Sequence, residues 1–221
     1  MPSASTAQLL VESPLLCPGD RMGRDEFLER WGRMPDVKFA ELIDGVVYMP
    51  SPLSRSHARR DSLIHVWLFH YAERAGHCEM LPNATWLMGR KSAPQPDLSL
   101  RRTRELGGRS KTGSNDLMAG VPELAVEICL SSRSYDLGPK RALYQTSGVP
   151  EYLAVVVENE QIEWRTLEGG RHRLMKPHRD GTFRSRVFPG LWLDADAYWR
   201  LDWPRMQATL ARGLATESAK S

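Results

Sequence analysis

With 221 residues, 26% of them charged and 41% hydrophobic, the chain has the composition of a soluble globular protein and a length between one and two typical domains. No apolar run approaches the roughly 20 residues that a membrane-spanning helix needs, so we expect a cytoplasmic protein without membrane association. The net charge of +3 at pH 7 permits an anionic partner without requiring one.

The sequence contains no composition change or linker that would divide it into two domains. The first 20 residues lack the basic start and the apolar core of a secretory signal, so we interpret residues 1–20 as a loose surface tail. Nothing in the middle of the chain resembles a linker, and we expect residues 21–221 to form one domain that ends in a helix. Three widely spaced cysteines indicate neither a disulfide framework nor a zinc site.

The first part of the chain predicts a helix, a hairpin and a long helix. Residues 25–34 carry apolar side chains at helical spacing. Residues 39–49 form a hairpin pattern split by Asp44 and Gly45, a pair that favours a type I′ turn. An apolar stripe along residues 54–75 predicts the longest helix.

Extended segments and a long connection follow. Residues 78–88 and 97–100 are expected to be extended, and residues 101–120 form a polar connection of a length that is typical of functional or mobile loops. The run LAVEICL at residues 124–130 then predicts a strand covered on both faces, although it contains the carboxylate of Glu127.

The last part of the chain predicts a crossover unit, a hairpin and a helix. A helix at residues 138–147 precedes an aliphatic strand at residues 152–157, and strand, helix and strand in this order imply a parallel pair. Residues 162–175 read as a hairpin around Glu168-Gly169-Gly170, and residues 194–214 as the terminal helix.

Glu127 needs a partner, because burying an isolated carboxylate is costly unless it pairs with a cation or binds a metal. Lys140, in the first turn of the helix that returns the chain toward the sheet, could reach it. Asp97 begins a strand after two prolines that fix the approach of the chain, and Glu41 starts the hairpin. The alternatives are a structural ion pair for Glu127 and Lys140, a turn-capping carboxylate for Asp97 and a solvated hairpin residue for Glu41.

An ordered series of segments resembles a known family. The segments are FAELIDGVVYMPSP, His57 in the long helix, PQPDLSL, ELAVEICLSS, Asp136 with Lys140 and Tyr144, and GVPEYLAVV. Together, across roughly residues 25–194, they resemble the Uma2 family of predicted endonucleases, which belongs to the PD-(D/E)XK nuclease superfamily. The resemblance implies an α/β, restriction-endonuclease-like fold with a mixed central sheet flanked by helices.

The same resemblance implies an activity and a site. It implies a metal-dependent endonuclease that hydrolyses phosphodiester bonds of DNA. Asp97 and Glu127 are implied as the ligands of Mg²⁺ or Mn²⁺, Lys140 as the active-site lysine and Glu41 as a further acidic residue of the site. Mg²⁺ keeps several waters and binds proteins through one or two carboxylates, which suits this pair.

Two positions depart from the pattern of the superfamily. The position two residues after Glu127, where the superfamily has a lysine, holds Cys129, so the resemblance implies that Lys140 supplies the cation from the following helix. Cys129 itself is expected to be a small buried apolar residue. Val46 stands where many relatives have another glutamate, which argues against a second carboxylate there.

Clustered basic residues predict contacts with nucleic acid. The connection after Asp97 is expected to follow a phosphate backbone beside the metal ligands, through Arg101, Arg102, Arg104, Arg109 and Lys111. A second cluster at the start of the long helix includes Arg55 and Arg59, although such a charged face is often only solvated. No base-reading motif is visible, so no sequence specificity is predicted.

Assembly and two further function classes remain open at this point. The aromatic residues of the C-terminal part, Trp192, Tyr198, Trp199 and Trp203, together with the hairpin at residues 162–175, predict an exposed apolar patch and hence a homodimer. A nuclease-like protein that has lost catalysis and binds nucleic acid or another partner is the first alternative function. A hydrolase of another phosphate-bearing substrate is the second, and the absence of a glycine-rich phosphate loop argues against it.

Overall fold

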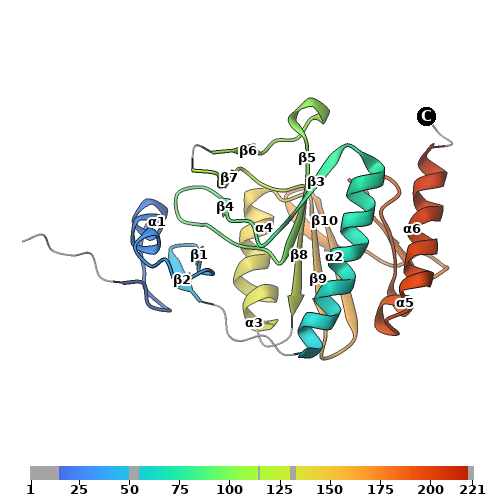
Figure 1. Ribbon diagram of the computed structural model, residues 1–221, viewed down its shortest axis with the longest axis horizontal. Helices are drawn as coiled ribbons and strands as arrows, with labels where there is room; N and C mark the ends of the chain where they lie inside the picture. Colours follow the sequence, from blue (N-terminus) through green and yellow to red (C-terminus); the bar gives the residue numbers. More distant parts are fainter. Residues whose placement is uncertain (1–14, 50–54, 114, 130–132, 219–221) are drawn as a thin grey trace, which may run out of the picture.

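The computed structural model describes residues 15–49, 55–113, 115–129 and 133–218. Most of the tail expected at residues 1–20 therefore lies outside the described residues. Figure 1 shows a central sheet with helices on both faces and a smaller N-terminal unit beside it.

Six strands form the central sheet, in the order β11-β10-β9-β8-β5-β3. Their bounds are β3 Cys78–Pro82, β5 Leu98–Arg102, β8 Leu124–Cys129, β9 Glu151–Val156, β10 Gln161–Glu168 and β11 Arg171–Leu174. Strands β8 and β9 are parallel, and the remaining neighbours are antiparallel. The expected mixed sheet and the expected parallel pair are thus confirmed.

Strand β8 lies in the middle of this sheet, and all six of its residues are buried. Its aliphatic side chains alternate between two cores. Leu124, Val126 and Ile128 belong to one core, and Ala125 and Cys129 to the other. The strand is therefore covered on both faces, as its uninterrupted apolar run predicted.

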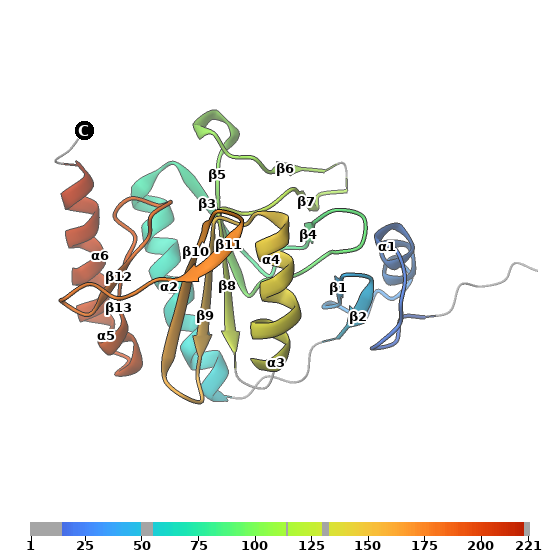
Figure 2. The same ribbon diagram turned by 180° about the vertical axis from the view of Figure 1, so that it is seen from behind.

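The helices divide between the two faces of the sheet (Figures 1 and 2). Helix α2 (Arg55–Ala75), with α5 (Ala195–Trp199) and α6 (Trp203–Ser218), covers one face. A short helix α3 (Arg133–Tyr135), a π-helical turn η2 (Asp136–Lys140) and helix α4 (Arg141–Ser147) cover the other. Within the described ranges, no helix is long and apolar enough to span a membrane.

The N-terminal unit consists of helix α1 (Arg24–Gly32) and the hairpin of β1 (Glu41–Ile43) and β2 (Val46–Tyr48), with a core of its own. The turn residues Asp44 and Gly45 both have positive φ, 48° and 82°, as a type I′ turn requires. The hairpin that the sequence predicted is therefore confirmed together with its turn type.

The connection expected at residues 101–120 is more structured than a loop. It contains the 3₁₀ turn η1 (Arg104–Leu106) and two short strands, β6 (Lys111–Thr112) and β7 (Met118–Ala119), which form a small sheet with β4 (Trp86–Leu87). Two further differences concern the C-terminal part. The expected terminal helix is split into α5 and α6, with Leu201 between them at a φ of 58°. Strands β12 (Thr182–Arg184) and β13 (Trp192–Asp194) were not predicted.

The aromatic residues from which a homodimer was predicted do not form an exposed patch, because they pack against the core of this chain, and the homodimer itself stays a prediction. Tyr198 is fully buried, and Trp199 and Trp203 pack against the same core, which also contains Ile162 and Met175. Trp192 lies under the guanidinium of Arg184, whose Cζ is 3.7 Å from the ring centroid. These side chains complete the core between the sheet and the C-terminal helices, so they do not form the exposed patch that was expected.

Candidate active site

Two carboxylates face each other on neighbouring strands. Strands β5 and β8 pair antiparallel with Leu98 opposite Val126, so the next pair in this register is Asp97 and Glu127. The backbone N–H of Ile128 donates to Asp97 Oδ2 over 2.6 Å, which holds the Asp97 side chain against β8. Glu127 is only 2% exposed, whereas Asp97 is partly exposed. The site is therefore built on the rigid centre of the sheet.

Lys140 reaches this pair from the π-helical turn η2. The turn contains Pro139, which lacks a backbone N–H and so cannot continue the regular α-helical hydrogen bonds. Such π turns are frequent at functional sites. Here the turn places Lys140 Nζ 2.7 Å from Glu127 Oε1. Only 3% of the lysine side chain is exposed, so this is a buried ion pair.

Glu41 joins the same cluster from the first residue of β1. Its Oε1 lies 2.9 Å from Lys140 Nζ and accepts a hydrogen bond from the backbone N–H of Gln95 at 2.6 Å. The hydroxyl of Tyr135 donates to the other oxygen, Oε2, at 3.4 Å. Glu41 is thus held by three donors from three segments, and the interpretation of it as a solvated hairpin residue is wrong.

Two more side chains complete the cluster. The hydroxyl of Tyr144 donates to Glu127 Oε1 at 2.7 Å, and Asp136 Oδ1 lies 4.0 Å from Lys140 Nζ. Both residues belong to the segments that resemble the family, but neither was predicted as a residue of the site. A signal was present, because Tyr144 follows Lys140 by four residues, the spacing that brings side chains onto one helical face.

Burial and charge act against each other in this cluster. Burial raises the pKa of the Glu127 carboxyl well above its ordinary value; Lys140 opposes that rise, and the negative charges of Asp136, Asp97 and Glu41 add to it. Burial alone would lower the pKa of Lys140, but Glu127 and Glu41 raise it well above its usual value. Lys140 is therefore charged, and its one ammonium is shared between two carboxylates.

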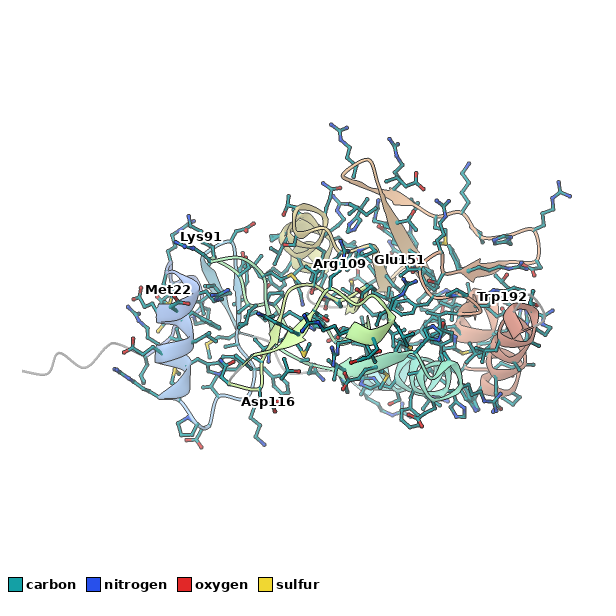
Figure 3. All side chains as sticks on the ribbon, turned by 90° about the horizontal axis from the view of Figure 1, so that it is seen from above. Met22, Lys91, Arg109, Asp116, Glu151 and Trp192 are labelled. Carbon is teal, nitrogen blue, oxygen red and sulfur yellow. The ribbon has the colours of Figure 1, made fainter. Side chains whose placement is uncertain are left out.

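A second buried carboxylate on the neighbouring strand makes a useful contrast. Glu151, labelled inside the molecule in Figure 3, is fully buried and accepts hydrogen bonds from Ser185 Oγ, Trp164 Nε1 and the backbone N–H of Arg186. Neutral donors of the chain itself thus satisfy Glu151. Glu127 instead depends on a cation, as a buried carboxylate of a reactive site commonly does.

The carboxylates of Asp97 and Glu127 are few, but they are oxygen donors of the kind that a hard divalent cation prefers. In the described part of the chain, no group of three or more His, Cys, Asp or Glu residues is arranged to hold a metal ion. Mg²⁺ commonly needs only one or two carboxylates, since water and substrate oxygens fill its other positions. Asp97 and Glu127, opposite each other in the register of adjacent strands, supply that number of carboxylates.

Cys129 occupies the superfamily's lysine position and does not contribute a charge. It is fully buried in the core on the α4 side of the sheet, and burial raises the pKa of its thiol. The expectation of a small buried apolar residue is confirmed.

The basic connection after Asp97 does not lie beside the carboxylates, so that expectation is wrong. Strand β5 carries the chain away from Asp97, and five residues of strand place Arg102 about 16 Å from it. Figure 1 shows the loop after β5 at the top, whereas the C-terminal end of β8 and α3 lie at the bottom. Moreover, Arg101 pairs with Glu79, Arg102 donates to the carbonyl of Val187 and Arg109 to that of Gly148. Arg104 and Lys111 are exposed in the same loop.

Arg55 and Arg59 lie at the opposite end of the central sheet from the loop after β5. They are exposed in the first turns of α2, which begins at the bottom of Figure 1 near α3. Arg60 faces inward and donates to the backbone carbonyls of Tyr198 and Trp199. The side chain of His57, which was part of the family resemblance, lies outside the described residues.

Comparison with known proteins identifies a family and a similar fold. The model of the Uma2 family, described as "Putative restriction endonuclease", matches residues 24–196. The chain belongs to the Uma2 family. Its matched region contains all four acidic and basic residues of the predicted site, Glu41, Asp97, Glu127 and Lys140.

A solved structure supports the fold of this Uma2 protein. It is described as a putative nuclease belonging to DUF820 from Anabaena variabilis, and it matches with a TM-score of 0.62 at 12% sequence identity. The match covers 80% of this chain and 97% of that chain. At this identity the likeness establishes a restriction-endonuclease-like fold and nothing more. No curated protein matches the chain.

Proposed function

We propose that this Uma2 protein is a metal-dependent endonuclease that hydrolyses phosphodiester bonds of DNA. One observation carries the proposal: Lys140 Nζ lies 2.7 Å from Glu127 Oε1, on the strand that faces Asp97. Two carboxylates and a lysine close together on a central sheet can hold a metal ion and stabilise developing negative charge, which suits phosphodiester hydrolysis. Membership of a family of nucleases supports the reaction class.

The residues of this chain have distinct roles in the proposal. Asp97 and Glu127 would hold the divalent ion, which supplies a bound water of lowered pKa and neutralises charge on the phosphate. Lys140 orients the attacking water or stabilises the negative charge that develops on the phosphoryl oxygens. Glu41 helps to fix the lysine, because it is a second carboxylate in contact with the ammonium, 2.9 Å from Nζ. Tyr144 fixes the Glu127 carboxylate through its hydroxyl.

The main alternative is a nuclease-like protein that has lost catalysis and binds nucleic acid or a partner. It does not explain why the site keeps buried charge. When an ammonium and carboxylates are buried together, the free energy lost on desolvation is often as large as the free energy gained from their attraction. A protein without catalysis would therefore be as stable or more stable with apolar residues in their place. The cluster of Glu41, Glu127 and Lys140 therefore favours a retained activity.

Cleavage of supercoiled plasmid DNA tests the proposal. We expect the purified chain to nick the plasmid in Mg²⁺ or Mn²⁺ and to be inactive in EDTA, because the metal supplies the activated water. Asp97→Asn is expected to abolish nicking in either metal, whereas Asp116→Asn, in an exposed turn, is the matched control and should cleave like the wild type. An intact plasmid in both metals, with protein that binds DNA, would establish the inactive alternative.

Binding of DNA is expected to depend on the α2 cluster. Arg55→Ala with Arg59→Ala should weaken binding of a 20-base-pair duplex and reduce the slope of log K against log salt by about 2, because each lost phosphate contact releases one counterion fewer. Fluorescence anisotropy at several KCl concentrations measures this slope. The matched control is Arg104→Ala with Lys111→Ala, two exposed basic residues at the opposite end of the sheet. Equal effects of the two double variants would contradict the placement of DNA at α2.

A further inference from the structure

A cavity of about 500 Å³ lies apart from the carboxylate cluster, on the side of the molecule where the N-terminal unit meets helix α4. Its walls come from the β1–β2 turn, the end of β4 with the segment after it, the residues after β7 and the C-terminal part of α4, and Asp44, Lys91, Val121 and Ser147 belong to these four walls. The volume is in the range of small-molecule sites, which is roughly 300–1,000 Å³. The proposed nuclease function uses none of the lining residues.

Two cations line this cavity without an ion-pair partner among the residues that the structure describes. Arg90 and Lys91 line it and are exposed, and neither forms an ion pair with any residue that the structure describes. Figure 3 shows Lys91 on the outside of the N-terminal end of the molecule, near Met22. Both residues are fixed through their backbone, since Arg24 N donates to Arg90 O and Gly45 N donates to Lys91 O. A rigid turn thus presents two positive side chains, an arrangement that suits a phosphate group.

The other lining residues include apolar side chains and a carboxylate, whereas a site for a simple anion would have cations and hydrogen-bond donors. Leu87, Met88, Val121 and Leu143 supply an apolar wall. Asp44 adds a carboxylate, whose Oδ1 makes one long contact of 3.5 Å with Ser92 Oγ. A carboxylate would repel a bare phosphate, but it can accept a hydrogen bond from a sugar hydroxyl or from an amino group of a base. Cations, an apolar wall and a hydrogen-bond acceptor together match the three parts of a nucleotide.

The cavity shares two structural elements with the carboxylate cluster. Asp44 is the first turn residue of the hairpin that begins with Glu41, and Leu143 lies three residues after Lys140, on the helix that carries Tyr144. These two lining residues are thus each three residues along the chain from a member of the carboxylate cluster, a span of roughly 5 Å in the helix and 10 Å in the strand.

We propose that this cavity binds a nucleoside phosphate, with the phosphate at Arg90 and Lys91, the base against the apolar wall and Asp44 accepting a hydrogen bond from the sugar or the base. Either a free mononucleotide or the phosphorylated end of a DNA strand presents this chemistry. The choice of a nucleotide rests on the proposed nuclease function, whereas the cavity and its charges do not depend on it.

Calorimetric titration of the full-length chain with dAMP, with a 5′-phosphorylated oligonucleotide and with inorganic phosphate tests the proposal. Arg90→Ala with Lys91→Ala should weaken binding of dAMP or of the phosphorylated oligonucleotide at least about tenfold, because two charge-assisted hydrogen bonds are lost. Alanine keeps both backbone contacts, so these variants should fold. The control double variant Arg104→Ala with Lys111→Ala should bind within about twofold of the wild type.

Asp44→Asn separates a nucleotide from a bare anion. Asparagine tolerates the positive φ of this turn, so the backbone is retained. The variant should bind inorganic phosphate more tightly, since a repulsive charge is gone, and dAMP or the oligonucleotide less tightly, since a charged acceptor is lost. If binding of dAMP depends on Arg90 and Lys91, a free nucleotide is sufficient as the ligand. If only binding of the phosphorylated oligonucleotide depends on these two residues, the ligand is the end of a DNA strand.

Three results would overturn the proposal. The first is that neither dAMP nor the phosphorylated oligonucleotide binds at millimolar concentration. The second is that Arg90→Ala with Lys91→Ala leaves their binding unchanged. The third is that inorganic phosphate binds as tightly as dAMP. The readout is binding and not cleavage. Nucleotide binding that depends on Arg90 and Lys91 in a chain that never nicks DNA would therefore contradict the proposed activity and leave this site standing.

Discussion

Lys140→Met is expected to lower the free energy of unfolding by about 3 kcal/mol, because it leaves buried carboxylates without their ammonium. Methionine has nearly the length of lysine, so the loss reflects charge and not a cavity. In the structure the Lys140 side chain is 3% exposed, and its Nζ lies 2.7 Å from Glu127 and 2.9 Å from Glu41. In EDTA the thermal midpoint should fall by about 10 °C in a chain of this size.

Manganese should reverse part of this loss. Without the ammonium, Asp97, Glu127 and Glu41 present negative charge that a divalent cation can offset, so Mn²⁺ should raise the melting temperature of Lys140→Met more than that of the wild type. Lys111→Met, which changes an exposed lysine, is the control and should melt like the wild type under both conditions. A loss below about 1 kcal/mol in EDTA is the size expected of a surface ion pair, and it would contradict the buried cluster.

Glu127→Gln is expected to lower the rate of cleavage at least about 1,000-fold while changing stability by no more than about 1 kcal/mol. The amide oxygen can still accept hydrogen bonds from Tyr144 and Lys140, and Lys140 keeps Glu41 as its ion-pair partner. What the amide cannot provide is the negative charge that holds a metal. Rates of plasmid nicking in Mn²⁺, with melting curves in EDTA, measure both quantities.

The matched control for this variant is Glu160→Gln, an exposed turn residue that should change neither quantity. A large loss of stability combined with retained nicking would mean that Glu127 serves only as the structural partner of Lys140. Such a result would remove Glu127 from the proposed metal site.

Much of the fold and the acidic part of the site could be predicted because local patterns agreed with the final packing. The run of aliphatic residues around Glu127 is buried in the structure from end to end, and the Asp44-Gly45 pair forms the turn it favours. The anomaly of a carboxylate in that run was itself the signal for a partner, and Lys140 is that partner.

The errors arose where position in the sequence was taken for position in space. The arginines after Asp97 are its neighbours in the sequence, but a strand carries the chain to the opposite end of the sheet. The helix break at Leu201 and the strands β12 and β13 turn the aromatic residues near the C-terminus inward. Because neither feature gives a periodic signal in the sequence, these residues were interpreted as exposed apolar surface. The π-helical turn that aims Lys140 at Glu127 was likewise read as ordinary helix.

We propose that Asp97 and Glu127 hold a divalent metal beside Lys140. A crystal of the full-length chain soaked in Mn²⁺, measured for anomalous scattering, tests it most directly. We predict an anomalous peak at about 2.1 Å from a carboxylate oxygen of Asp97 and of Glu127, and its loss in crystals of Glu127→Gln. A fully occupied manganese elsewhere, with none between these two carboxylates, would contradict the claim.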